Sequence, residues 1–197
     1  MKEIFKQAVD NHKKNNFQVA LNLYNKVLEI EPKHIIANSN IGAIFLVLGN
    51  YQKAKDYLEK TIKIDPNYLD AYNNLGITLK MLGDNHKAIK CYEKIIKINP
   101  SYVSAYNNLG SVFYKLKEYQ DAKDCYEKAI ELKPNSQVAL INRGKILFEK
   151  GEFELSLIDF DNCNNFDSRS RALTSLYALG RIDEIYRRIK KNSKLDE

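Results

Sequence analysis

The chain has 197 residues, of which 44% are hydrophobic and 28% charged, a composition that excludes an intrinsically disordered protein. Its net charge of +6 comes from lysines scattered among acidic residues, so it does not form the basic stripe that nucleic-acid binding requires. No apolar run approaches the ~18 residues of a membrane span, and the N-terminal segment lacks the apolar core of a secretion signal. We therefore expect a cytoplasmic protein with neither a membrane nor a nucleic acid as its partner.

The prolines and glycines of the chain reveal an internal repeat of 34 residues. Four prolines follow one another at this interval: Pro32, Pro66, Pro100 and Pro134. If proline is placed at position 32 of each repeat, seven of the eight glycines fall at positions 8 and 15 only. Such self-similarity is typical of an array of identical supersecondary units.

Each repeat is predicted to contain two helices, at about positions 1–14 and 18–31. Glycine at position 15 suits the left-handed end of the first helix, and proline at position 32 ends the second. Apolar residues at positions 7, 11, 20, 24, 27, 28 and 30 form one packed face. In chain order the predicted units are residues 1–34, 35–68, 69–102, 103–136 and 137–167, then an irregular capping helix pair and tail over 168–197.

The pattern weakens towards both ends of the array. The fifth unit has Ser168 where proline is expected, and Arg143 replaces the apolar residue at position 7. The aliphatic stem of Arg143 can still pack if its guanidinium reaches water. Gly180 resembles position 15 of a further unit whose first helix is about five residues short. We therefore predict two final helices, over 168–179 and 181–191.

These motifs resemble the tetratricopeptide repeat. The resemblance is carried by Asn-Leu-Gly at 74–76 and 108–110, by the small residue at position 20, by Tyr at position 24 and by Pro at position 32. It implies an all-α fold, a right-handed α-solenoid of stacked antiparallel helix pairs, with about five such units and a capping pair. It also implies that the first helices line a concave groove.

Within this groove, position 6 of repeats two to five is always asparagine. An asparagine side chain offers both donors and acceptors, so a row of them could hold the backbone of an extended peptide. This row resembles the asparagine ladder of the O-linked N-acetylglucosamine transferases; the alternative is that asparagine is simply common at this position. The predicted partner-binding residues are Asn40, Asn74, Asn108, Asn142, Asn73, Asn107, Lys80, Tyr114, Lys115, Lys145 and Phe148.

The sequence gives no indication of catalytic chemistry. The three histidines lie in separate contexts without the spacing of a metal site, and no glycine-rich phosphate loop is left once the repeat glycines are assigned. Cys91 and Cys125 share position 23 of adjacent repeats, too far apart for a disulfide. We expect a protein that is not an enzyme and that holds no metal or cofactor.

The predicted function is a protein–protein interaction scaffold that binds a partner protein or an extended peptide in its groove. One alternative is the substrate-recruiting N-terminal module of a larger enzyme: a 2-oxoglutarate/iron oxygenase, a glycosyltransferase or a sulfotransferase. A third is self-association through the ends of the stack. A receptor for acidic chaperone tails is disfavoured, because the lysines of a two-carboxylate clamp are missing from position 5.

Overall fold

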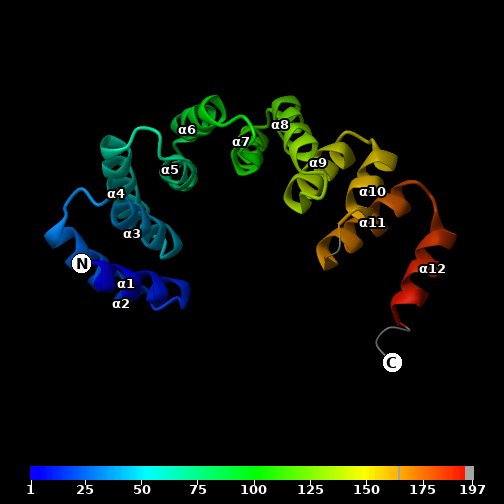
Figure 1. The fold of residues 1–197 in the computed structure, drawn as a ribbon. Helices are drawn as coiled ribbons and strands as arrows, with labels where there is room; N and C mark the ends of the chain where they lie inside the picture. The colour runs from blue at the N-terminus through cyan, green and yellow to red at the C-terminus, as the bar shows by residue number, and fades with distance from the viewer. Residues whose placement is uncertain (164, 194–197) are drawn as a thin grey trace. The chain divides into compact units, whose positions relative to one another are not determined.

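A computed structural model describes residues 1–163 and 165–193, which form twelve helices and no strand (Figure 1). Residues 194–197, the last part of the predicted tail, lie outside these residues. The helices are α1 (Lys2–Lys13), α2 (Phe17–Ile30), α3 (Ile35–Val47), α4 (Tyr51–Ile64), α5 (Leu69–Met81), α6 (Asn85–Ile98), α7 (Val103–Lys115), α8 (Tyr119–Leu132), α9 (Gln137–Glu149), α10 (Phe153–Asp161), α11 (Phe166–Ala178) and α12 (Ile182–Ser193).

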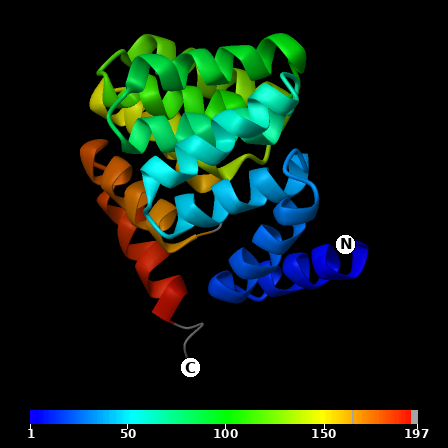
Figure 2. The same cartoon turned by 90° about the vertical axis from the view of Figure 1, so that its left-hand side faces the viewer.

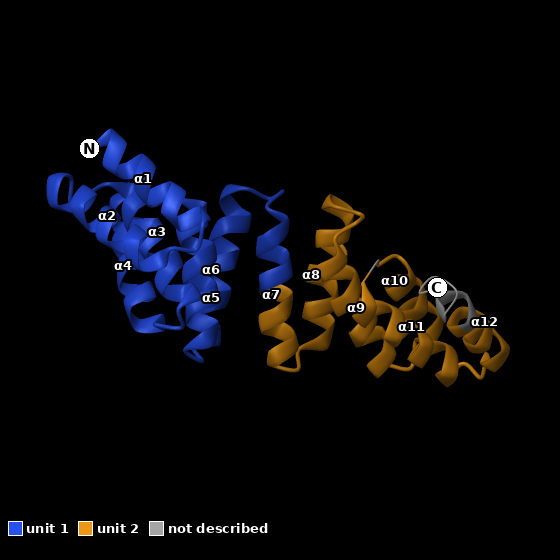
Figure 3. Ribbon diagram, turned by 90° about the horizontal axis from the view of Figure 1, so that it is seen from below, with its two compact units in different colours: residues 1–108 blue, residues 109–197 orange. Residues whose placement is uncertain are grey.

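The chain divides into two compact units, shown in different colours in Figure 3. Unit 1 comprises Met1–Asn108, and unit 2 comprises Leu109–Glu197, so that the boundary falls inside α7. Within unit 1, consecutive helices such as α1 and α2, or α3 and α4, pack side by side (Figure 2). Within unit 2, α10 packs against both α9 and α11. The predicted all-α fold of stacked helix pairs is thus confirmed.

A residue with left-handed backbone geometry follows each odd-numbered helix. Three of these residues are the predicted glycines at position 15, and Gly180 adopts the same geometry after α11 with φ +70°. Where position 15 lacks glycine, Asn15 and Lys117 take it instead, with φ 60° and 64°. A left-handed lysine costs roughly 1–2 kcal/mol, so the turn between the paired helices fixes this geometry more strongly than the residue type does.

Glycine at position 8 allows the two helices of a repeat to pack closely. A Cβ atom at Gly76 would lie 2.6 Å from the ring of Tyr92, and one at Gly144 would lie 2.8 Å from the ring of Phe160. Both rings are almost completely buried in the core. The position-24 side chain therefore occupies the space that the missing side chain leaves.

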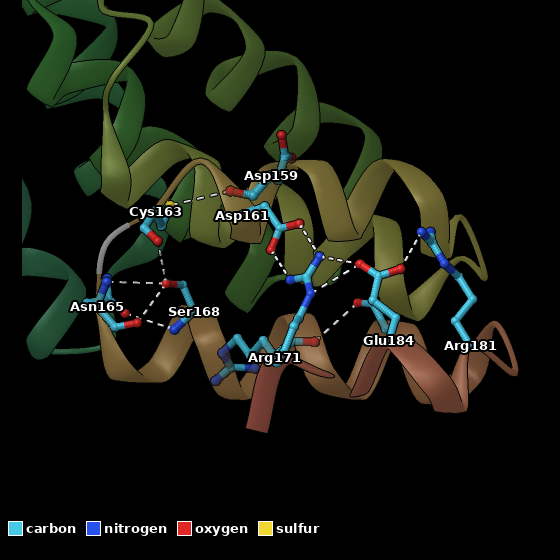
Figure 4. Close-up of polar contacts among 10 residues, drawn as sticks. Asp159, Asp161, Cys163, Asn165, Ser168, Arg171, Arg181 and Glu184 are labelled. Atoms are coloured by element: carbon cyan, nitrogen blue, oxygen red, sulfur yellow. Dashed lines mark hydrogen bonds and ion pairs between the residues drawn. The ribbon is translucent and has the colours of Figure 1, made fainter. Parts of the chain in front are cut away.

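The irregularity near the C-terminus lies in the second helix of the fifth repeat. Helix α10 has 9 residues where α2, α4, α6 and α8 have 14, whereas α11 has 13 residues like α9. The final helix pair was predicted to have a first helix about five residues short, and this prediction is therefore wrong. Helix α11 begins at residue 166 because Asn165 and Ser168 form a capping box, in which the Asn165 side chain accepts a 2.8 Å bond from the Ser168 amide (Figure 4).

Helix α12 is held to α10 by a charged cluster. Arg188 donates two hydrogen bonds to Asp161, at 2.6 and 2.9 Å, and a third of 2.7 Å to Glu184. Arg181 also pairs with Glu184 (Figure 4). These contacts keep the last helix pair packed in unit 2 like a further repeat.

Candidate protein-binding surface

The asparagines at position 6 occupy two different environments. Asn40 is half-buried, and its amide donates a 3.0 Å hydrogen bond to the hydroxyl of Tyr24 in the preceding helix. In the equivalent place, the side chain of Asn142 interacts with the hydroxyl of Tyr126. In these two repeats the amide therefore fastens the first helix of one repeat to the second helix of the repeat before it, which leaves only part of its capacity for a ligand.

The remaining two position-6 asparagines are not fastened in this way. The amide of Asn108 donates a 2.9 Å bond to the side-chain oxygen of Asn73. The side chain of Asn74 makes no hydrogen bond to any residue in the described ranges, and the preceding repeat has Leu58 where the others have a tyrosine or phenylalanine. Asn74 is half-buried and keeps its full hydrogen-bonding capacity.

Unit 2 contains a cavity of about 350 Å³. Its wall is formed by side chains from α7, α9, α10 and α11: Tyr114, Lys145, Phe148, Glu149, Phe160, Arg171 and Thr174. Tyr114, Lys145 and Phe148 are the three predicted groove residues that meet here. Of the other two predicted non-asparagine residues, Lys115 is not part of the wall, and Lys80 lies in α5 of unit 1. Among the predicted asparagines, Asn107 is half-buried in α7, within unit 1.

A hydrogen bond across the cavity wall fixes the acidic residue of the site. The hydroxyl of Tyr114 donates a 2.6 Å bond to Glu149. This bond to a carboxylate raises the pKa of Tyr114 to about 12, so the hydroxyl stays protonated as a donor throughout the physiological range. Glu149 is thereby drawn towards α7.

The two cationic residues of the wall keep unused donors. Lys145 and Glu149 stand four residues apart on α9, a spacing at which such side chains commonly pair. Lys145 nevertheless makes no ion pair or hydrogen bond with any described residue. The Nε atom of Arg171 binds Asp167 at 2.9 Å and lowers the pKa of that carboxyl, while the terminal nitrogens of Arg171 have no partner in the described part of the chain.

The remaining wall is aromatic. The ring of Phe148 lies edge-on against that of Phe153, with centroids 5.1 Å apart. Phe160 is 2% exposed and belongs to the core of unit 2. The wall of the cavity therefore combines aromatic rings with a few charged groups, the usual composition of a ligand site.

The guanidinium of Arg143 is bound by a buried acidic residue, while the side chain as a whole stays 23% exposed. It donates hydrogen bonds of 2.9 and 2.6 Å to the two carboxylate oxygens of Asp159, a residue of α10 that is 1% exposed. A buried carboxylate must be paired, and the fork of an arginine fits it with two parallel bonds.

Arg171 and Thr174 are not among the predicted groove residues, because both lie in the segment predicted as a cap. A signal for them was present: if Gly180 is position 15, they fall at positions 6 and 9, which face the groove in the other repeats. Counting backwards from the glycine would have placed both residues on the wall.

The described residues show neither a metal-binding cluster nor a membrane-spanning helix. They contain no group of three or more His, Cys, Asp or Glu side chains that could hold a metal ion. No helix within them has the length and apolar character needed to cross a membrane. Burial raises the pKa of the free thiols of Cys91 and Cys125 to about 12, which makes them poor nucleophiles.

Two family models, both described as tetratricopeptide repeat, match residues 33–101 and 103–136, which together exceed half of the chain. The chain belongs to the tetratricopeptide repeat family. No curated protein matches the sequence significantly.

Solved structures of repeat proteins share the fold at low sequence identity. PilF of Pseudomonas aeruginosa has a TM-score of 0.84 at 18% identity, and the match covers 98% of this chain and 90% of PilF. MamA has a TM-score of 0.71 at 24% identity, covering 90% of this chain and 96% of MamA. YrrB, a TPR protein with an unusual peptide-binding site, has a TM-score of 0.68 at 22% identity, covering 90% of each chain.

Proposed function

We propose that this protein is an interaction scaffold that binds a partner polypeptide, in extended form, against its odd-numbered helices. The tetratricopeptide repeat fold supports a role in protein–protein interaction. The observation that carries the finer proposal is the cavity of unit 2, whose wall includes an aromatic ring and cationic groups with unused donors.

The size of the cavity favours a peptide segment over a folded surface. At about 350 Å³ it lies at the small end of the ~300–1,000 Å³ range of ligand pockets. Such a volume accepts one or two side chains. A partner that presents single side chains from an extended backbone fits this geometry better than a flat domain surface does.

Unit 1 offers a second element of the same proposal. Asn74, with its uncommitted amide, could donate to a peptide carbonyl and accept from a peptide N–H, while Asn73 and Asn108 form a linked pair beside it. Each hydrogen bond to a peptide contributes ~0.5–1.5 kcal/mol, so replacing Asn74 with alanine should weaken binding about two- to tenfold.

The experiment begins with random linear peptides displayed on phage and selected on the intact chain. Affinities of the selected peptides are then measured by fluorescence polarisation for wild type and variants. Thr174→Trp should block the cavity, because Thr174 is an exposed wall residue and the larger ring can enter the open space. Ser170→Trp, at an exposed site on the same helix outside the cavity wall, is its control.

For unit 1, Asn74→Ala is compared with Asn67→Ala, which removes an exposed asparagine from the loop before α5. We expect each test variant to bind more weakly than its control. Failure to enrich any linear peptide, or selected peptides that bind Thr174→Trp and Asn74→Ala as tightly as wild type, would overturn the proposal.

The alternative of a recruiting module for a larger enzyme stays a prediction, as does self-association. The contacts within residues 1–163 and 165–193 test neither of these two alternatives.

A further inference from the structure

The polar groups of the unit 2 cavity are distributed so that positive charge is available and negative charge is already engaged. Glu149 is the acidic residue of the wall, and the Tyr114 hydroxyl holds it at 2.6 Å. Lys145, from the same helix, has no such partner in the described residues. Glu149 is thus hydrogen-bonded to α7 and not to the ammonium group of Lys145 on its own helix.

Arg171 adds a second cation with an oriented free edge. Its Nε atom is fixed by Asp167 at 2.9 Å, which holds the guanidinium plane while leaving both terminal nitrogens unbonded within the described residues. An arginine presented in this way suits the two oxygens of a carboxylate. Asp167 lies outside the cavity wall and is largely exposed, so solvent screens its own charge.

The same cavity also has aromatic residues in its wall. Phe148 is held edge-on by Phe153, and Phe160 is fixed in the core. An apolar side chain placed on these rings would gain from burial, and a carboxylate next to it would reach the cationic edge. A ligand with only the apolar side chain, or only the carboxylate, would contact either the rings or the cations but not both.

We propose that the unit 2 cavity recognises a peptide segment in which an aromatic or aliphatic side chain is followed by a carboxylate. The apolar side chain lies on Phe148 and Phe160, and the carboxylate bonds to Lys145 and Arg171. The inference rests on the proposed function, which it deepens by naming the ligand chemistry. The carboxylate can come from an acidic side chain or from the C-terminus of the partner.

Three N-acetylated dipeptides of similar size test the proposal on the intact chain. N-acetyl-Phe-Glu-amide carries a side-chain carboxylate, N-acetyl-Phe-Gln-amide is its neutral counterpart, and N-acetyl-Gln-Phe with a free C-terminus carries a terminal carboxylate. Dissociation constants are obtained from NMR titrations of the ¹⁵N-labelled protein. Thr174→Trp should abolish the titration of the peptides, which locates binding in the cavity.

We expect at least one carboxylate peptide to bind about tenfold more tightly than the neutral peptide, as a charge-assisted hydrogen bond implies. Whichever carboxylate peptide binds more tightly identifies the source of the carboxylate. In Lys145→Met, which keeps most of the aliphatic stem, this ratio should fall towards one, and Lys145→Arg should restore it. Lys133→Met removes a charge from an exposed site of unit 2 outside the wall and should leave the ratio unchanged.

Equal binding of the neutral and carboxylate peptides to wild type, an unchanged ratio in Lys145→Met, or no binding of any dipeptide would overturn the inference. These results differ from a failure of the proposed function. If phage-selected peptides lack acidic residues yet lose affinity in Thr174→Trp, the scaffold proposal stands and only the ligand chemistry is wrong.

Discussion

Arg143 and Asp159 form the ion pair of unit 2 whose removal should be most costly. Both carboxylate oxygens of Asp159 are hydrogen-bonded to the guanidinium, and its side chain is 2% exposed while that of Arg143 is 23% exposed. Repeats two to four have isoleucine or leucine at the arginine position. The natural perturbation is therefore Arg143→Leu, which restores the common residue and leaves a buried carboxylate without its partner.

The expected cost follows from this burial. Removing one member of a buried ion pair costs about 3–5 kcal/mol, because the remaining charge is neither hydrated nor compensated. The double variant Arg143→Leu/Asp159→Cys reproduces the residues that the third repeat has at Leu75 and Cys91. Replacing both partners by apolar residues is commonly neutral or stabilising, so the double variant should regain most of the stability.

Urea unfolding followed by circular dichroism at 222 nm measures these differences. Arg169→Leu, at an exposed site on α11 with no side-chain partner in the described residues, is the matched control and should change stability by less than about 0.5 kcal/mol. If Arg143→Leu stays within 1 kcal/mol of wild type, or if the double variant is as unstable as the single one, the assignment of a stabilising buried pair is refuted.

Three further predictions concern two glycines and the thiols. Gly76→Ala should lower stability by about 1–3 kcal/mol in urea unfolding, because its Cβ would lie 2.6 Å from the Tyr92 ring. Gly151→Ala meets no neighbour within 4 Å but must keep φ +79°, so its loss in the same assay should be about 1–2 kcal/mol. With pKa values raised to about 12, Cys91 and Cys125 should react with Ellman's reagent at pH 8 only after unfolding; their stabilising effect is complete below pH 8.5 and is lost as pH rises towards 12.

The helix pairs could be predicted because glycine and proline have local effects that act through the backbone alone. Gly49 and Gly83 follow α3 and α5 with positive φ, as the spacing indicated. The shortening of α10 could not be placed in the same way. The interval to Gly180 shows that about five residues are missing, but the helix that loses them is chosen by the Asn165–Ser168 cap and by packing.

The candidate site was only partly predictable, because its electrostatics depend on contacts between repeats. The frame placed Tyr114, Lys145 and Phe148 on one face, and the cavity contains all three. The frame could not show that the Tyr114 hydroxyl engages Glu149 across 35 residues of sequence. That contact decides which charges of the wall are available to a ligand.

The asparagine row shows why alignment of a residue in a repeat does not by itself define its role. Asn40 follows a repeat with Tyr24, and its amide is used by that hydroxyl at 3.0 Å. Asn74 follows a repeat with Leu58 at the same position, and its amide is uncommitted in the described residues. The hydrogen-bonding capacity at position 6 thus differs between repeats. A tyrosine 16 residues earlier does not decide it alone, because Asn108 follows Tyr92 yet bonds to Asn73. We therefore do not expect the four asparagines to contribute equally to peptide binding. Asn74 should contribute most, because the amides of the others are already used within the protein.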